Sequence, residues 1–113
     1  MMNMKLVVFV LNKEEYLNEV LEAFVELGIS GATVIDSVGM GRILAHDIPI
    51  FAGFRNLLQE SRPGNKTILT AVEDDKVELM VKSLERMIGS FDEPGNGIFM
   101  SLPLDFVKGI HQF

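Results

Sequence analysis

The residue types best suited to ligand chemistry are two glycines and an arginine, in the run Gly39-Met40-Gly41-Arg42. Glycine tolerates positive φ and leaves backbone N–H groups uncovered, and arginine adds a fixed positive charge. We therefore expect a small anion-binding seat formed by Gly39, Gly41 and Arg42. The alternative is that the glycines only make a tight bend where a strand leaves the sheet.

A long segment, residues 42–64, follows this run before the next strand pattern. Connections of this length inside a small domain are usually functional or mobile. The segment carries large apolar side chains, among them Ile50, Phe51, Phe54 and Leu57. Because exposed apolar patches tend to mark interfaces, these four residues are candidates for docking onto a partner protein. The alternative is that the segment packs on its own subunit or on a neighbouring one.

Catalytic and metal-binding patterns are weak. No Ser-His-Asp or Cys-His set can be assembled, so we expect no enzyme activity. His46 and His111 are the only histidines, and their spacing matches no common metal motif. We therefore predict no metal site, and keep His46 and His111 as weak candidates.

Composition excludes several classes of function. The 113 residues include no cysteine, so disulfides and thiolate chemistry are absent, which is compatible with the cytoplasm. A net charge of −6 argues against binding to nucleic acid, which needs clustered Lys and Arg. No apolar run approaches the roughly 18 residues of a membrane span. We expect one cytoplasmic domain over residues 1–113 that does not insert into membranes.

The elements that position the glycines begin with a continuous apolar run, Met4–Leu11, which predicts a buried strand. Helical spacing of apolar residues follows over Lys13–Leu27, and Asn12 with Glu15 reads as a capping box at its start. The β-branched residues of Ala32–Val38 then predict the strand that leads into the Gly-Arg run.

The second half repeats the order of the first. Thr67–Val72 reads as a strand, and a helix over Val77–Ile88 follows a second capping box in Asp75–Glu78. A turn then leads to a strand at Ile98–Leu102, and Phe106–Ile110 is expected to add a short further strand.

This order of elements predicts an α+β fold, a ferredoxin-like βαββαβ sandwich with antiparallel sheet order 4-1-3-2 and two helices on one face. The strands Met4–Leu11 and Thr67–Val72 should be central, because they are the most continuously apolar. The exposed edge strands would need a cover, and oligomerisation is the simplest one. A flavodoxin-like sheet is the rival fold, but it needs more βα units than the chain holds.

The sequence resembles the PII signal-transduction superfamily, which includes the nitrogen-regulatory PII proteins. The similarity covers nearly the whole chain except the central segment. It rests on an ordered set of short motifs at family-like spacing: Met4–Val7, Leu27–Val34, Gly39–Arg42, Val72–Val77 and Gly95–Pro103.

The resemblance implies a homotrimer of ferredoxin-like subunits with a ligand cleft between neighbours. An adenine nucleotide, ATP or ADP, is the cofactor it implies, although the residues themselves identify none. A long loop, here residues 42–64, would dock onto a regulated enzyme or a membrane transporter. Gly39, Gly41 and Arg42 would form the base of that loop, and Gly95 and Gly97 match the family's phosphate-holding turn.

Several positions depart from the family pattern. Ile43 stands where classical PII has a glutamine, and Ile98 stands where a lysine follows the second glycine of the turn. Gly109 and His111 replace a pair of arginines. Each lost charged hydrogen bond forfeits on the order of 1.5–3 kcal/mol, which argues against the family's usual tight ATP binding.

The sequence therefore predicts a PII-like trimeric regulator that senses a small, anionic ligand at clefts between subunits. It would act on a protein partner through the 42–64 segment. The alternative is a metal-ion-binding trimer of the CutA kind, in which His46 or His111 would take the ion.

Overall fold

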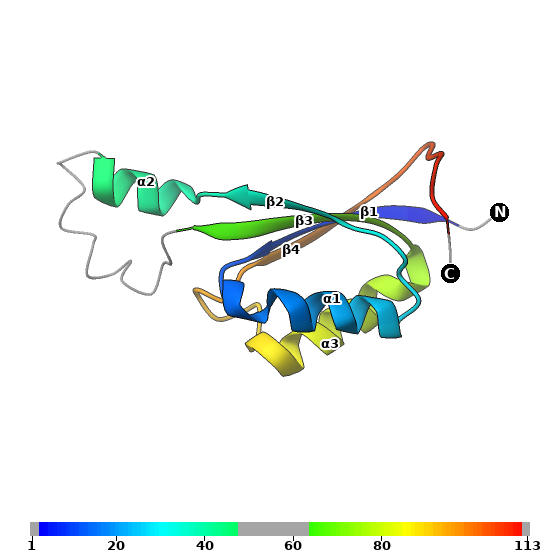
Figure 1. The fold of residues 1–113 in the computed structure, drawn as a ribbon, viewed down its shortest axis with the longest axis horizontal. Helices are drawn as coiled ribbons and strands as arrows, with labels where there is room; N and C mark the ends of the chain where they lie inside the picture. The colour runs from blue at the N-terminus through cyan, green and yellow to red at the C-terminus, as the bar shows by residue number, and fades with distance from the viewer. Residues whose placement is uncertain (1–2, 48–63, 112–113) are drawn as a thin grey trace.

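The structure is a computed structural model of the chain, and it describes residues 3–47 and 64–111. Its elements follow one another along the chain (Figure 1): β1 (Met4–Leu11), the 3-10 turn η1 (Glu14–Tyr16), α1 (Leu17–Glu26), β2 (Thr33–Ser37), α2 (Met40–Asp47), β3 (Asn65–Glu73), the 3-10 turn η3 (Asp74–Lys76), α3 (Val77–Ile88) and β4 (Ile98–Pro103).

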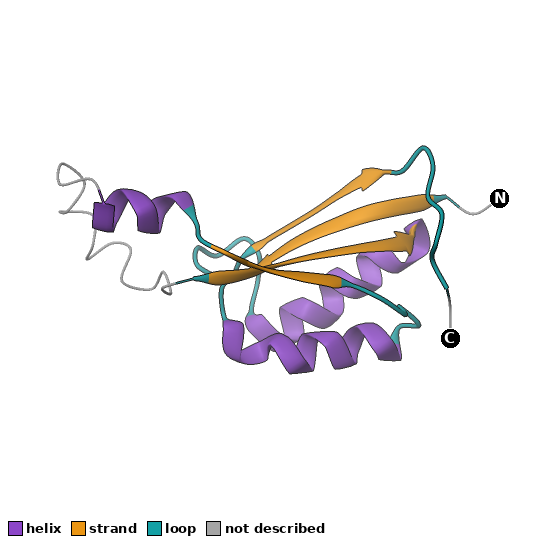
Figure 2. Ribbon diagram, turned by 45° about the horizontal axis from the view of Figure 1, so that its top comes forward, coloured by secondary structure: helices purple, strands orange, loops and turns teal. Residues whose placement is uncertain are grey.

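The four strands form one antiparallel sheet in the order β2-β3-β1-β4. This is the predicted order 4-1-3-2 read from the other edge, so the ferredoxin-like α+β fold is confirmed. Both central strands are also as predicted. Helices α1 and α3 lie side by side on the same face of the sheet (Figures 1 and 2).

The core lies between that face and the two helices. Alternate residues of β1 are fully buried, and the register places Val7 opposite Thr70 and Phe9 opposite Ile68. The helices contribute apolar residues at helical spacing, and the core as a whole consists of Val7, Phe9, Leu11, Val20, Phe24, Ile29, Ile68, Val72, Met80, Leu84 and Ile88. Burying each large apolar side chain stabilises the fold by about 1.5–3 kcal/mol.

The opposite face of the sheet has no covering helix among the described residues (Figure 2). The alternation of β1 and β4 directs Leu6, Val8 and Val10 to it, with Leu102, Met100 and Ile98 as their partners across the sheet. The β4 side chains are 46%, 47% and 56% exposed, respectively. We call these six residues the uncovered face. It is an apolar surface that the isolated chain leaves in water.

The sequence did not predict α2. The 42–64 segment was expected to be loop from Arg42 onward, but Met40–Asp47 is helical. Gly41 therefore sits inside a helix, and neither Gly39 nor Gly41 is among the glycines with positive φ. These two glycines therefore do not use the positive φ that glycine tolerates. Residues 48–63, with Ile50, Phe51, Phe54 and Leu57, lie outside the described residues.

The two long helices do not start at the predicted capping boxes. Each long helix starts after a 3-10 turn, and the residues that precede α1 and α3 are Tyr16 and Lys76, which make no capping hydrogen bond through their side chains. The Asn12 side chain instead bonds to residues far away in the sequence. Tertiary hydrogen bonds have here replaced the local ones.

The end of the chain is irregular rather than a fifth strand. Residues 106–110, predicted as a short strand, have no strand assignment. The segment leaves β4 with a hydrogen bond from Leu104 N to Met4 O, 3.0 Å long, and the His111 carbonyl accepts one from the Ser30 hydroxyl. Within residues 3–47 and 64–111, no helix is long and apolar enough to cross a membrane.

Candidate functional site

The strand ends nearest α2 surround a cavity of about 350 Å³. We call it the loop-base cavity, because β2 leads into the 42–64 segment here and β3 leads out of it. Residues from all four strand ends and from the start of α2 line it: Val10, Asn12, Ser37, Val38, Gly39, Gly41, Gly64, Asn65, Thr67 and Ile98. The structure thus brings two of the predicted ligand residues, Gly39 and Gly41, to one cavity.

The two ends of the 42–64 segment approach each other closely here, most tightly at Gly64. A Cβ added to Gly39 would lie 3.7 Å from Asn65 Nδ2, and one added to Gly64 would lie 3.3 Å from the Ser37 carbonyl oxygen. The second distance is tighter than ordinary van der Waals contact. The small residues let the two ends of the 42–64 segment leave the sheet side by side.

The other predicted glycines lie in the turn before β4. Gly95 and Gly97 have φ of +88° and +106°, a region that side chains other than glycine rarely adopt. A Cβ on Gly97 would lie 2.3 Å from the Val10 carbonyl oxygen. Gly95 joins the cavity indirectly, because its carbonyl accepts a hydrogen bond from Asn12 Nδ2 at 3.3 Å. The turn therefore adjoins the loop-base cavity.

The first turn of α2 adds backbone donors. Ile43 N donates to Gly39 O at 3.3 Å, which closes the first helical turn. The N–H groups of Met40, Gly41 and Arg42 precede that bond and have no carbonyl partner within the helix. Such groups, together with the helix dipole, favour an anion. The predicted residue Arg42 belongs to this turn.

Lys66, which lies between the cavity residues Asn65 and Thr67 in the sequence, is committed to ion pairs. Lys66 lies on the face of the sheet that bears the helices and pairs with Asp36, and its Nζ also lies 3.7 Å from Glu14 Oε1. The hydrogen bond with Asp36 raises the pKa of Lys66, with further contributions from the Asp36 and Glu14 charges. These pairs join β2, β3 and η1.

Sequence reasoning missed four polar residues of the cavity: Asn12, Ser37, Asn65 and Thr67. Their side chains hydrogen-bond to one another across strand ends. Ser37 and Asn65 stand at strand ends close to Gly39 and Gly64, which is the one sequence signal that marked them; no such signal marks Asn12. Their partners lie too far along the chain for a local pattern to reveal.

The structure gives no support to His46 and His111, the two weak candidates for metal binding. Among the described residues, no group of three or more His, Asp or Glu side chains could hold a metal ion. α2, which carries His46, lies at one end of the sheet, and the chain end with His111 lies toward the other (Figure 1). Within one subunit, the two histidines are therefore not brought together.

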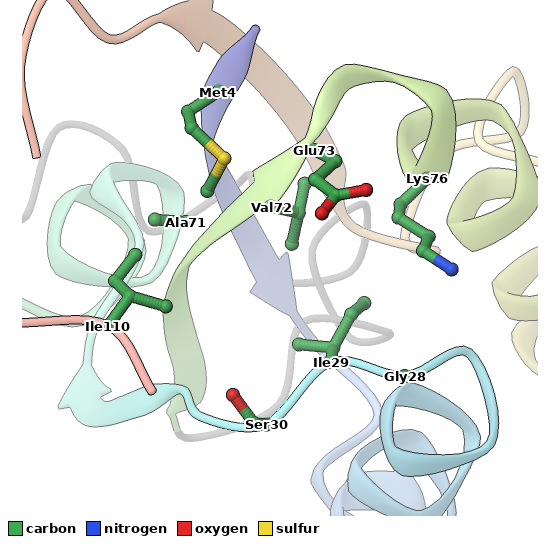
Figure 3. A pocket seen from close by; sticks show the side chains of 9 residues that line it. All are labelled: Met4, Gly28, Ile29, Ser30, Ala71, Val72, Glu73, Lys76 and Ile110. Carbon is green, nitrogen blue, oxygen red and sulfur yellow. The ribbon is translucent and has the colours of Figure 1, made fainter. Parts of the chain in front are cut away.

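A second cavity, of about 320 Å³, lies at that other end of the sheet (Figure 3). The side chains of Met4, Ile29, Val72 and Ile110 surround it, and Glu73 and Lys76 stand at one side. A Cβ on Gly28 would lie 3.7 Å from Lys76 Nζ, which places this ammonium beside the C-terminal end of α1. The last turn of α1 has no basic residue of its own, so Lys76 complements the helix dipole.

Comparisons with known proteins match the chain to one family model and to solved structures of similar fold. The family model described as nitrogen regulatory protein P-II matches residues 4–110. A solved structure with a similar fold is described as that of a functionally unknown protein from Pediococcus pentosaceus ATCC 25745. It is 18% identical over 97% of this chain and 100% of that chain, with a TM-score of 0.65. No curated protein matches the chain.

Proposed function

We propose that this chain, which belongs to the family of the nitrogen regulatory protein P-II, senses a small anionic ligand at the loop-base cavity. Membership of this family makes it a P-II-like regulatory protein. Ligand occupancy would change the 42–64 segment, and this segment would report to a protein partner such as an enzyme or a transporter. A ligand can do this only if it binds the two states of the segment with different affinity.

One observation carries this proposal. Gly39 and Gly41, predicted as ligand residues, line one cavity with both ends of the 42–64 segment, and the Gly95–Gly97 turn adjoins it. A ligand placed there would touch the segment where it enters and leaves the sheet. The N–H groups of the first turn of α2, which have no carbonyl partner within the helix, favour a negatively charged ligand.

We further propose that the working unit is a homotrimer with the uncovered faces packed inward. The exposed Ile98, Met100 and Leu102 are the basis for this proposal, because soluble monomers rarely leave a contiguous apolar patch of this kind in water. Packing these faces together would bring the loop-base cavity of each subunit close to a neighbour, which could complete the site.

Isothermal titration calorimetry of the full chain tests the ligand proposal. The ligands are ATP, ADP, AMP, cyclic dinucleotides and bicarbonate, each up to millimolar concentration. At least one of them should bind. Arg42→Ala should weaken its binding about ten- to a hundredfold, because the loss of one charged hydrogen bond lowers the affinity by about that factor. The control is Arg86→Ala, on an exposed part of α3. No heat with any of these ligands would overturn the proposal.

A further inference from the structure

Four polar side chains connect three strand ends with the turn before β4. Ser37 closes β2, Asn65 and Thr67 belong to the start of β3, and Asn12 follows β1. We call this chain of side chains the relay. Ser37 Oγ lies 2.7 Å from Thr67 Oγ1 and bonds to Asn65 Oδ1. Asn65 Nδ2 lies 3.3 Å from Asn12 Oδ1, and Asn12 Nδ2 lies 3.3 Å from the Gly95 carbonyl oxygen.

The direction of each hydrogen bond in the relay follows from one backbone carbonyl. The Gly95 carbonyl can only accept, so Asn12 turns its Nδ2 to Gly95 and its Oδ1 to Asn65. Asn65 then presents Nδ2 to Asn12 and Oδ1 to Ser37. Since Ser37 gives its one proton to Asn65, the Thr67 hydroxyl donates to Ser37. The orientation of the turn is thus passed on to the end of β2.

The relay ends in the two regions where the proposed function places ligand contacts. At one end, Asn65 Nδ2 lies 3.7 Å from where a Cβ on Gly39 would be, so its amide packs against the base of the 42–64 segment. At the other end lies the Gly95–Gly97 turn. All four relay residues also line the loop-base cavity, so a ligand there would touch them directly.

We propose that Asn12 and Asn65 are positioning residues that couple the conformation of the Gly95–Gly97 turn to the base of the 42–64 segment. The inference deepens the proposed function, on which its regulatory meaning rests. If the Gly95 carbonyl turns away, the relay loses the acceptor that fixes its direction, so the Asn12 amide can flip and the hydrogen bonds of Asn65 and Ser37 must reverse with it. The amide orientation is a two-state element of the kind that coupling between sites requires.

Hydrogen exchange of the ligand-free full chain tests this coupling. Asn12→Ala should speed amide exchange about fivefold in residues 38–43 as well as in the turn, because the free energy of one hydrogen bond corresponds to about that change in rate. Asn12→Asp has the same shape and keeps an acceptor for Asn65, but it loses the donor to Gly95, so it should act in the same direction. Asn3→Ala is the control, because Asn3 bonds with Asp74, outside the relay.

A double-mutant cycle separates coupling from local loosening. Among the described residues, the relay joins Asn12 and Ser37 through Asn65. The double variant Asn12→Ala with Ser37→Ala should therefore speed exchange in residues 38–43 about as much as either change alone, roughly fivefold. Two independent effects, whose free energies add, would speed it about twenty-fivefold. Additive effects, or an Asn12→Asp effect confined to the turn, would overturn the inference. Since no ligand is present, this result is independent of the calorimetric one.

Discussion

At the scale of single residues, glycines set how closely the turn before β4 approaches β1. Gly97 combines φ of +106° with a backbone contact that leaves no room for a side chain. Gly31, in contrast, has an open space where its Cβ would be and no positive φ. The family resemblance marks Gly97 as a phosphate-binding residue, and the structure adds a separate, conformational reason for glycine there.

We expect Gly97→Ala to lower the free energy of unfolding by at least about 2 kcal/mol, because positive φ and the close Val10 carbonyl both act against a methyl group. Urea unfolding followed by circular dichroism measures this. Gly31→Ala is the matched control and should change stability by less than about 1 kcal/mol. Equal effects of the two variants would contradict the close approach of the turn to β1.

The ion pair of Lys66 and Asp36 gives a second residue-scale prediction. Asp36→Asn should lower the pKa of Lys66, because the hydrogen bond with Asp36 is the largest cause of its upward shift. NMR titration of the Lys66 side chain measures the change, with Asp92→Asn as the control. Since the folded pKa is raised, the pair stabilises the fold fully below the unfolded value of 10.5 and loses its contribution as pH rises through the folded pKa. No change in the pKa of Lys66 would mean that the pair does not form in solution.

At the scale of elements, the two long helices owe their place to the apolar face that each presents to the sheet. α3 buries Met80, Leu84 and Ile88 completely or nearly so, and leaves Leu79 46% exposed. No side-chain cap supports its start, and Gly89, with φ of +99°, follows its end. Packing, more than capping, therefore holds this helix.

Two leucines of α3 test this. Leu84→Ala should lower the free energy of unfolding by about 2–5 kcal/mol, since it opens a cavity in the core. Leu79→Ala removes the same atoms from an exposed site and should cost less than about 1 kcal/mol. Thermal unfolding of both variants measures the difference. Similar losses would show that α3 does not present this face to the sheet.

At the scale of the whole molecule, the uncovered face is the feature that a single copy leaves unexplained. One face of the sheet is packed beneath two helices, and the other carries a row of large apolar side chains. Strands with apolar residues on both faces suit a sheet that is buried on both sides. In the proposed trimer, the sister copies would supply the second cover.

Met100→Lys should disrupt this assembly, because it would bury an unpaired charge at the centre of the uncovered face. Sedimentation velocity should show a trimer for the natural sequence and a monomer for the variant. Leu79→Lys places the same charge on an equally exposed position of α3 and should leave the trimer intact. A monomer for the natural sequence, or a trimer unaffected by Met100→Lys, would refute this mode of packing.

The sequence by itself determined the α+β fold, the order of its strands and the central place of β1 and β3. These follow from apolar periodicity, which is a local signal that a single chain carries. The motifs also pointed to the family. Of the predicted ligand residues, Gly39 and Gly41 do meet at one cavity.

Only the tertiary structure decided which side chains meet at that cavity. Asn12 was expected to cap a helix nearby, but its partners Asn65 and Gly95 lie 53 and 83 residues away in sequence. α2 was likewise expected to be loop. A side-chain amide can bond to any donor or acceptor that the fold brings near, so its choice depends on how the strand ends converge, and no local pattern encodes that.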